Sequence, residues 1–253
     1  MDTTQALFEY LLRLADDRLI MGHRLSEWCG HGPILEEDIA LSNIALDLTG
    51  HASSLLGYAG QVEGKDRDAD RLAYWRDVRS YRNIKMVELP RGDFGFTIAR
   101  IYLFSTFSHF LYEQLIHSTD DMLRGLAEKA LKEIRYHLRH SRDWTLRLGD
   151  GTDESHERIQ KSINDLWMYS GELFERDEVD EILSTTGIVP DMRDLQGHWD
   201  YEVSDTLKQA TLTHPDNNQY MDTGGRQGIH TEHLGHLLDE MQSLVRLYPE
   251  AKW

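Results

Sequence analysis

Carboxylates and imidazoles recur together in this sequence at a spacing that places them on one side of a helix. Six histidines have an Asp or Glu four residues earlier: Glu27–His31, Asp47–His51, Glu113–His117, Glu133–His137, Asp194–His198 and Glu232–His236. Residues four apart are neighbours on a helix surface, where such a pair stabilises the helix by about 0.2–0.5 kcal/mol. The same two groups also ligate transition metals. Helix-face pairing and metal ligation by some of the pairs are the two interpretations.

A di-metal carboxylate site in a helical bundle needs a more specific pattern, which this chain lacks. Such a site takes a Glu from each of two helices and a Glu-x-x-His pair from each of the other two. No Glu-x-x-His occurs, and the one acid three residues before a histidine is Asp153 before His156, beside a glycine-rich turn. The pattern argues against a standard di-iron centre, and we expect this chain to hold no metal.

Other residues with chemical potential give weaker indications. His230, His233 and His236 stand three residues apart, which fits either a metal site or hydrogen-bonded and interface histidines. Gly224-Gly225 is a turn without a phosphate-binding pattern after it. No Gly-x-Ser-x-Gly elbow occurs, so an α/β-hydrolase nucleophile is absent from the sequence.

Two basic clusters stand out from an acidic background. One comprises Arg76, Arg79, Arg82, Lys85 and Arg91, and the other comprises Lys132, Arg135, Arg139 and Arg142. The second set shares one helix face, and we call it the basic stripe. Each cluster is either a solvated, ion-paired face or a site for an anion or an acidic partner.

The elements that must position these residues are helices. Helical spacing of apolar residues runs over residues 4–29, 35–62, 94–118, 120–147, 153–174, 192–212 and 229–247. The five prolines fall between or after these segments, and no alternating strand pattern occurs. The sequence therefore predicts an all-α chain, with a bundle of four long helices and additional C-terminal helices, in a single domain over residues 1–253.

Composition excludes several classes of partner. The chain has 253 residues and a formal net charge of −17, which disfavours nucleic acid and anionic membrane surfaces. The mean hydropathy is −0.54, and no run of about 18 apolar residues predicts a membrane span. The first 17 residues lack a basic n-region, so we expect no signal peptide. With Cys29 as the only cysteine, we expect a cytoplasmic protein without intramolecular disulfides.

Four separated motifs resemble the C subunits of the bacterial phenylacetyl-CoA epoxidases. They are Leu25-Ser-Glu-Trp-Cys-Gly-His31, Ala45-Leu-Asp-Leu-Thr-Gly-His-Ala52, Lys132-Glu-Ile-Arg-Tyr-His-Leu-Arg139 and Gly228-Ile-His-Thr-Glu-His-Leu-Gly235. The resemblance implies a ferritin-like fold and a non-catalytic member of a complex that epoxidises the ring of phenylacetyl-CoA. It implies the related di-iron catalytic subunit as the partner and an electron supply from a separate reductase.

The resemblance also assigns expectations to particular residues. Asp47-Leu-Thr-Gly50 and Glu133-Ile-Arg-Tyr136 stand where a di-iron relative has Glu-x-x-His, so both histidine positions are lost. His51 and His137 follow one residue later, about 100° further around the helix. We therefore expect Asp47 and Glu133 to be buried or semi-buried, and paired with Lys or Arg.

Substrate contacts are expected at two segments. Similarity to the family suggests Ser80, Tyr81, Arg82 and Asn83 as contacts to the acyl-CoA, whose phosphates suit the nearby arginines. Asp180, Glu181 and Ile182 lie in an acidic stretch and form a weaker candidate, better suited to a protein contact.

Three hypotheses remain open from the sequence. The leading one is an accessory subunit that braces the di-iron catalytic subunit, contributes to acyl-CoA binding and is able to form a homodimer when alone. The alternative is a self-sufficient di-iron hydroxylase with atypical ligands from Asp47, His51, Glu133 and His137. The third is an acidic helical scaffold unrelated to oxygenases.

Overall fold

The computed structural model describes residues 1–251, which contain ten α-helices, three short 3₁₀ helices and no strand. The helices are α1 (Thr3–Ser26), α2 (Leu35–Glu63), α3 (Ala69–Tyr74), α4 (Lys85–Glu88), α5 (Phe94–Leu115), α6 (Asp121–Gly149), α7 (Asp153–Trp167), α8 (Glu178–Thr185), α9 (Met192–Gln209) and α10 (Glu232–Leu247). The 3₁₀ helices are η1 (Val78–Ser80), η2 (Gly171–Phe174) and η3 (Gly225–Gln227). The predicted all-α class is confirmed.

Local sequence signals set the ends of the four long helices. Aspartates cap three of them, because the side chains of Asp2, Asp93 and Asp120 accept hydrogen bonds from backbone N–H groups in the first turns of α1, α5 and α6. Gly64 ends α2 in the left-handed conformation, with φ of 67°. The result is the expected ferritin-like bundle, in which α1 packs along α2 and α5 packs along α6.

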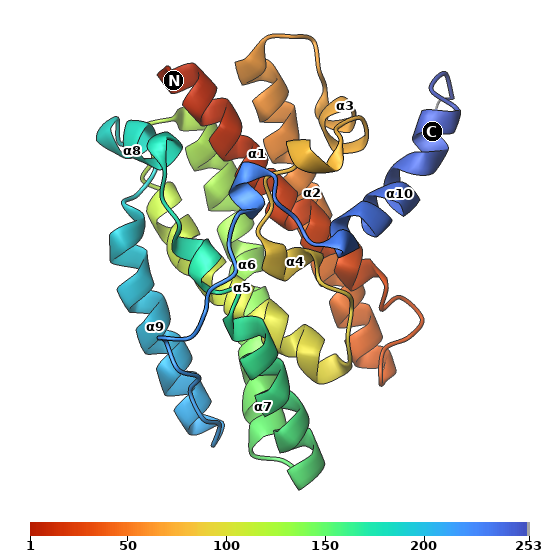
Figure 1. Cartoon of the computed structure of the whole chain (residues 1–253), viewed down its shortest axis with the longest axis vertical. Coiled ribbons are helices and arrows are strands. Elements are labelled where there is room, and N and C mark those ends of the chain that lie inside the picture. The colour runs from red at the N-terminus through yellow and green to blue at the C-terminus, as the bar shows by residue number, and fades with distance from the viewer. Residues whose placement is uncertain (252–253) are drawn as a thin grey trace.

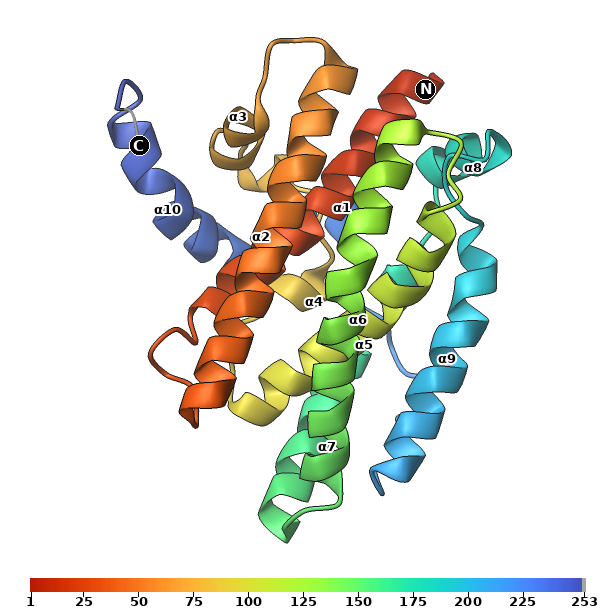
Figure 2. The same cartoon turned by 180° about the vertical axis from the view of Figure 1, so that it is seen from behind.

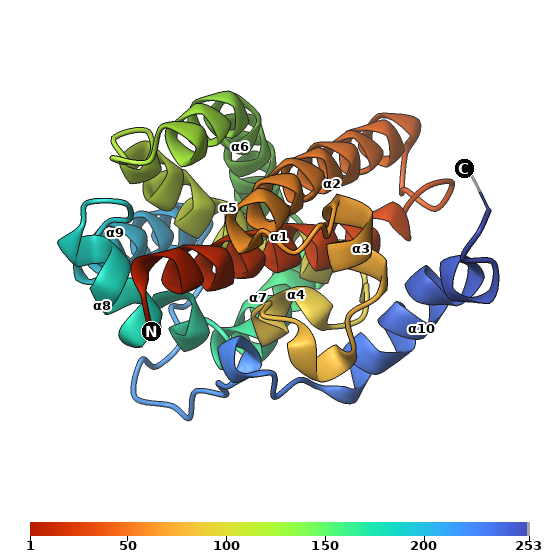
Figure 3. The ribbon, with the colours of Figure 1, turned by 90° about the horizontal axis from the view of Figure 1, so that it is seen from above.

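The bundle is layered when viewed from above (Figure 3). Helices α2 and α6 form an outer layer, and α1 and α5 form the layer beneath it. On the other side of the second layer lie α4, α7 and the C-terminal segment that leads into α10 (Figure 3). Because α5 is covered on both sides, most of its residues are buried, including Thr97, Arg100 and Ser105. The core is one continuous cluster of buried side chains from Ala6 to Leu238.

The two faces of the molecule are covered differently. The C-terminal segment crosses the face seen in Figure 1 before α10 projects from the body. From behind, α2 and α6 lie in front of the other elements along most of their length (Figure 2). Among the described residues, no helix has the length and hydropathy to cross a membrane.

Several boundaries differ from the sequence prediction. The helix expected over residues 153–174 ends at Trp167, where Tyr169 and Ser170 turn the chain into η2. Helix α8 was not predicted, because acidic residues crowd its sequence and only a few apolar ones mark its buried side. Helices α3 and α4 were also missed, since four to six residues are too few for a periodic pattern.

Candidate functional site

Two acid–imidazole pairs connect the outer helices of the bundle. His51 Nε2 on α2 lies 2.5 Å from Glu133 Oε2 on α6, and His137 Nε2 on α6 lies 3.0 Å from Asp47 Oδ2 on α2. The imidazoles are buried, whereas the carboxylate side chains keep about a third of their surface exposed, 31% for Asp47 and 38% for Glu133. Each acid therefore pairs with the histidine of the opposite helix, and the two pairs cross.

This arrangement corrects two expectations. Asp47 and Glu133 pair with histidines instead of Lys or Arg, and His51 and His137 point between the helices instead of away from them. Positions four apart on a helix differ by only about 40° in direction, so the histidine at that spacing follows its acid into the interface. Gly50 is instead on the exposed side of α2.

A buried guanidinium lies beneath these pairs. The Arg18 Cζ stacks 4.5 Å from the ring centroid of Tyr112, and its Nη1 donates to the carbonyl oxygen of Leu14 at 2.8 Å. Burial, together with the positive charge of Arg18, lowers the pKa of His51 to about 3. Burial and the nearby carboxylate of Asp47 raise the pKa of Glu133 above its usual value. The His51 imidazole is therefore neutral at physiological pH.

The donor set does not fit a di-iron centre. The Nε2 atoms of His51 and His137 are occupied by carboxylates across the helix interface. Within residues 1–251, no group of three or more His, Cys, Asp or Glu side chains is arranged to hold a metal ion. The Arg18 guanidinium would also repel a dication placed beside His51. This geometry gives no support to the alternative of a self-sufficient hydroxylase with ligands from Asp47, His51, Glu133 and His137.

A cavity of about 220 Å³ opens between α2 and α6 beside the crossed pairs. Its apolar walls come from Leu46, Leu55, Leu123, Leu126, Ala127 and Ala130. Two polar atoms of its lining residues, the Nδ1 of His51 and the hydroxyl of Tyr112, are buried without a hydrogen-bond partner among the described residues. Buried polar atoms are normally paired, so these two atoms stand out among the groups that line the cavity.

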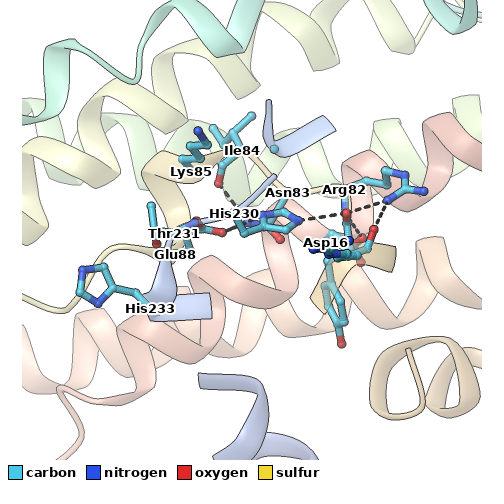
Figure 4. Close-up of polar contacts among 12 residues, drawn as sticks. Asp16, Arg82, Asn83, Ile84, Lys85, Glu88, His230, Thr231 and His233 are labelled. Atoms are coloured by element: carbon cyan, nitrogen blue, oxygen red, sulfur yellow. Dashed lines mark hydrogen bonds and ion pairs between the residues drawn. The ribbon is translucent and has the colours of Figure 1, made fainter. Parts of the chain in front are cut away.

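The segment Ser80–Asn83 belongs to a second polar region, drawn in Figure 4, in which the backbone N–H of Arg82 donates to Asp16 on α1. Tyr81 and Asn83 are fully buried: the Tyr81 hydroxyl donates to the carbonyl of Ala73, and Asn83 Nδ2 donates to Glu88 Oε2 at 2.9 Å. Ser80 is exposed and Arg82 is half-buried. Of the four expected substrate contacts, Ser80 and Arg82 therefore offer the accessible atoms.

Four buried carboxylates organise this second region, which we call the α1 clamp. They are Asp16, Asp17, Glu88 and Glu172, and each is at most 1% exposed. Asp16 receives the guanidinium of Arg76 and the backbone N–H of Arg82, and Asp17 receives Arg226 at 2.8 and 2.9 Å.

Glu88 and Glu172 hold the C-terminal segment within the same clamp. Glu88 accepts from His230 Nδ1 at 3.0 Å and from the backbone N–H of Thr231 at 2.5 Å (Figure 4). Glu172 accepts from the backbone N–H groups of Lys85 and Gly225. Burial raises the pKa of Glu172 to about 7, against the opposing effect of those N–H donors.

The clamp was not predicted from the sequence. Asp16 and Asp17 stand out there only as acids of the first helix, and their partners lie 60 to 209 residues away in the chain. The one signal in the sequence that could have indicated buried carboxylates is the position of Asp16 and Asp17 among apolar residues of α1, a helix that is buried on both sides. His230, one of the three closely spaced histidines, lies in the clamp as a hydrogen-bonding residue.

Known proteins of similar sequence identify the family. The model of the family described as "Phenylacetic acid catabolic protein" matches residues 1–253. The chain belongs to this family. A curated relative, the C subunit of the 1,2-phenylacetyl-CoA epoxidase of Escherichia coli K12, is 47% identical over 247 residues, covering 98% of this chain and 99% of the relative. The resemblance indicated by the four motifs is thereby confirmed.

In this member of the phenylacetic acid catabolic protein family, the basic stripe lies along the exposed side of α6. Lys132, Arg135 and Arg139 are exposed and Arg142 is half-buried. Arg135 pairs with Glu113 at 3.2 Å, and Arg142 pairs with Glu202 at 3.3 Å. The predicted face is therefore real, and the N-terminal end of the stripe carries the more accessible charge.

The second candidate segment, Asp180 to Ile182, lies near the start of α8. Asp180 is buried and accepts from Arg13 Nη1 at 3.1 Å, which anchors α8 to α1. Glu181 is exposed and Ile182 is half-buried. Asp180 therefore has a role in packing, and Glu181 is the accessible member of the three.

Proposed function

We propose that this chain is the accessory C subunit of a 1,2-phenylacetyl-CoA epoxidase in aerobic phenylacetate catabolism. Its role is to brace the di-iron catalytic subunit of the complex, and it contributes no catalytic residue or metal of its own. The observation that carries the proposal is the 47% identity to the C subunit of such an epoxidase, which extends over almost all of both chains.

The bundle centre supports an accessory role. A di-iron protomer needs convergent carboxylates and imidazoles around open metal positions. Here the imidazoles of His51 and His137 are hydrogen-bonded to carboxylates, and Arg18 supplies a fixed positive charge beneath them.

A contribution to acyl-CoA binding belongs to the same proposal. Ser80 and the half-buried edge of Arg82 would present a hydroxyl and a guanidinium to an anionic phosphate. Tyr81 and Asn83 would hold that edge in place through their buried hydrogen bonds. Glu181 and Ile182 would suit a contact with protein. The proposed location is the cytoplasm, where acyl-CoA substrates and a separate reductase are found together.

Reconstitution tests the proposal. The purified chain is mixed with the catalytic subunit, its reductase, NADPH and phenylacetyl-CoA, and the epoxide is measured by mass spectrometry. We expect a stable complex with the catalytic subunit and product only when both subunits are present. Product formed by this chain and the reductase alone, or no association with the catalytic subunit, would refute the assignment.

A further inference from the structure

The uncovered face of α2 is unusually poor in charge. The 24 residues from Ile39 to Val62 contain one Asp, Glu, Lys or Arg, namely Asp47, whereas the chain's average of 28% would place six or seven there. The same face exposes large apolar side chains: Leu35 is 71% exposed, Ile39 52% and Leu46 70%. Depletion of charge together with exposed apolar residues is typical of the central part of a protein interface.

The outward residues of α2 also follow a repeat that suits a partner helix. The residues in question are Ile39, Asn43, Leu46, Gly50, Ser53 and Gly57, at alternating spacings of four and three. Five of the six are exposed and Gly57 is half-buried. Alternating spacings of four and three residues are the pattern of a helix-on-helix packing seam. We call these six residues the α2 seam.

Two glycines in the seam have no explanation within the chain. Glycine in a helix interior costs about 1 kcal/mol relative to alanine. A Cβ atom added at Gly50 or Gly57 would meet nothing within 4 Å, so the chain's own packing does not demand glycine at either position. Gly22 and Gly60 differ, because a Cβ there would collide with neighbouring atoms. Close approach of a backbone from outside the chain is one physical reason for small residues on this face. Gly125, Gly197 and Gly235 on other helices have equally open surroundings, so the glycines count here only together with the exposed apolar residues.

The cavity beside the seam indicates, independently of the glycines, that a side chain of another protein could bind here. Gly50 and Leu46 line both the seam and the cavity. The Nδ1 of His51 and the hydroxyl of Tyr112, from side chains that are 7% and 2% exposed, have no partner among the described residues. A side chain delivered by a docked helix would fill this cavity and cover the enclosed atoms, as anchor residues do in the pockets at interface centres.

We infer that the α2 seam, with the adjoining cavity, is the surface on which the catalytic subunit docks one of its helices, with acidic residues facing the basic stripe of α6. This inference rests on the proposed function. The charge-poor segment is about 36 Å long and two helices are about 20 Å wide, which gives roughly 700 Å², close to one side of a standard stable interface.

The net charge of this chain disfavours a second copy of it as the protein that covers the seam. Two copies would each bring a net charge of −17 into contact, which opposes their association. The exposed Lys132, Arg135 and Arg139 beside the seam are instead complementary to an acidic rim on a different subunit.

The decisive experiment measures two properties of one variant. Gly50→Ala/Gly57→Ala should raise the melting temperature of the isolated chain, because alanine favours the helix and meets no obstacle there. The same variant should bind the purified catalytic subunit at least tenfold more weakly. Gly235→Ala on α10 is the matched control, since a Cβ there also meets nothing within 4 Å, and it should leave the affinity within twofold.

A second pair of variants tests the α2 seam without changing its glycines. Leu46→Asp should weaken binding to the catalytic subunit by at least thirtyfold, while Leu247→Asp, at a site of similar exposure on α10, should not. Circular dichroism verifies that both remain helical. If wild type binds and both Leu46→Asp and the glycine variant bind equally well, the inferred face is wrong while the proposed function stands.

Two further outcomes are distinguishable. If wild-type chain does not bind the catalytic subunit, the proposed function itself fails. If Leu46→Asp abolishes only self-association of this chain and leaves the complex intact, the seam joins two copies, and the inference is overturned.

Discussion

The α1 clamp and the crossed pairs between α2 and α6 are both built around carboxylates, yet their hydrogen-bonding groups are satisfied in different ways. In the clamp, four carboxylates that are at most 1% exposed receive arginines, a histidine and backbone N–H groups. Between α2 and α6, the carboxylates remain partly exposed, and buried atoms of His51 and Tyr112 lack partners within residues 1–251.

The difference indicates that the α1 clamp stabilises the fold, whereas the pairs between α2 and α6 lie on a surface that remains accessible. A buried charge network stabilises only when its charged members are paired, and the four carboxylates of the clamp meet that condition through segments that lie far apart in sequence. Two neutral atoms beside Glu88, Asn83 Oδ1 and Thr231 Oγ1, have no partner within residues 1–251. It fixes the C-terminal segment across α1, as Figures 1 and 4 show. The outer pairs lie beside a cavity on a face that the chain does not cover, and this is the surface that we infer for docking of the catalytic subunit.

The largest expected effect comes from breaking the clamp. Asp17→Asn would leave the guanidinium of Arg226, now paired with Asp17 at 2.8 Å, without its counter-charge in the interior. We expect a loss of about 3–5 kcal/mol in the free energy of unfolding, measured by urea denaturation. Asp165→Asn removes the partner of an exposed lysine, Lys161, and should cost at most about 0.5 kcal/mol. Equal effects of the two substitutions would contradict the comparison.

The pH dependence of stability gives the next largest effect. His51 has a pKa of about 3 in the folded chain, below its value of 6.5 in the unfolded chain. The unfolded state therefore binds a proton below pH 6.5 that the folded state does not, and stability falls as the pH decreases from 6.5 toward 3. At pH 5 this amounts to about 2 kcal/mol.

His51→Gln isolates that contribution. Because glutamine does not titrate, the stability of the variant should decline less between pH 7 and pH 5 than that of wild type, as followed by urea denaturation at each pH. Parallel pH profiles for the two proteins would show that His51 is protonated equally well in the folded and unfolded states.

A smaller effect is expected from the outer pair of Asp47. Asp47→Asn keeps a hydrogen-bonding group near His137 Nε2, and the side chain at position 47 is 31% exposed, so water can replace a lost bond. We expect a loss of about 1 kcal/mol, the net value of a typical hydrogen bond, measured by thermal and urea unfolding. A loss of unfolding free energy as large as that of Asp17→Asn would mean that the outer pairs stabilise the fold as much as the clamp does.

The smallest effect concerns the basic stripe. Lys132→Glu should lower the association rate with the catalytic subunit about tenfold at low salt and leave helix content unchanged, because exposed charge steers encounter. Lys161→Glu, an exposed lysine on α7, is the control and should change the rate little. Stopped-flow measurements at two salt concentrations give both values; equal rates for the two variants would remove the stripe from the docking surface.

The sequence was informative where periodicity and spacing act locally. It predicted the four long helices, the C-terminal helices and the shared helix face of Lys132 to Arg142. It failed where contacts are non-local: Asp17 meets Arg226 across 209 residues, and Glu88 meets His230 across 142. It also misjudged His51 and His137, because an angular offset within one helix does not reveal what the opposite helix presents.

Iron content tests the central claim most directly. The chain is expressed alone in iron-replete cells, purified without chelators, and its iron is measured by inductively coupled plasma mass spectrometry against protein concentration. The account predicts iron far below one atom per chain, with all iron of the assembled complex in the catalytic subunit. About two irons per chain, the stoichiometry of a di-iron carboxylate bundle, would contradict it.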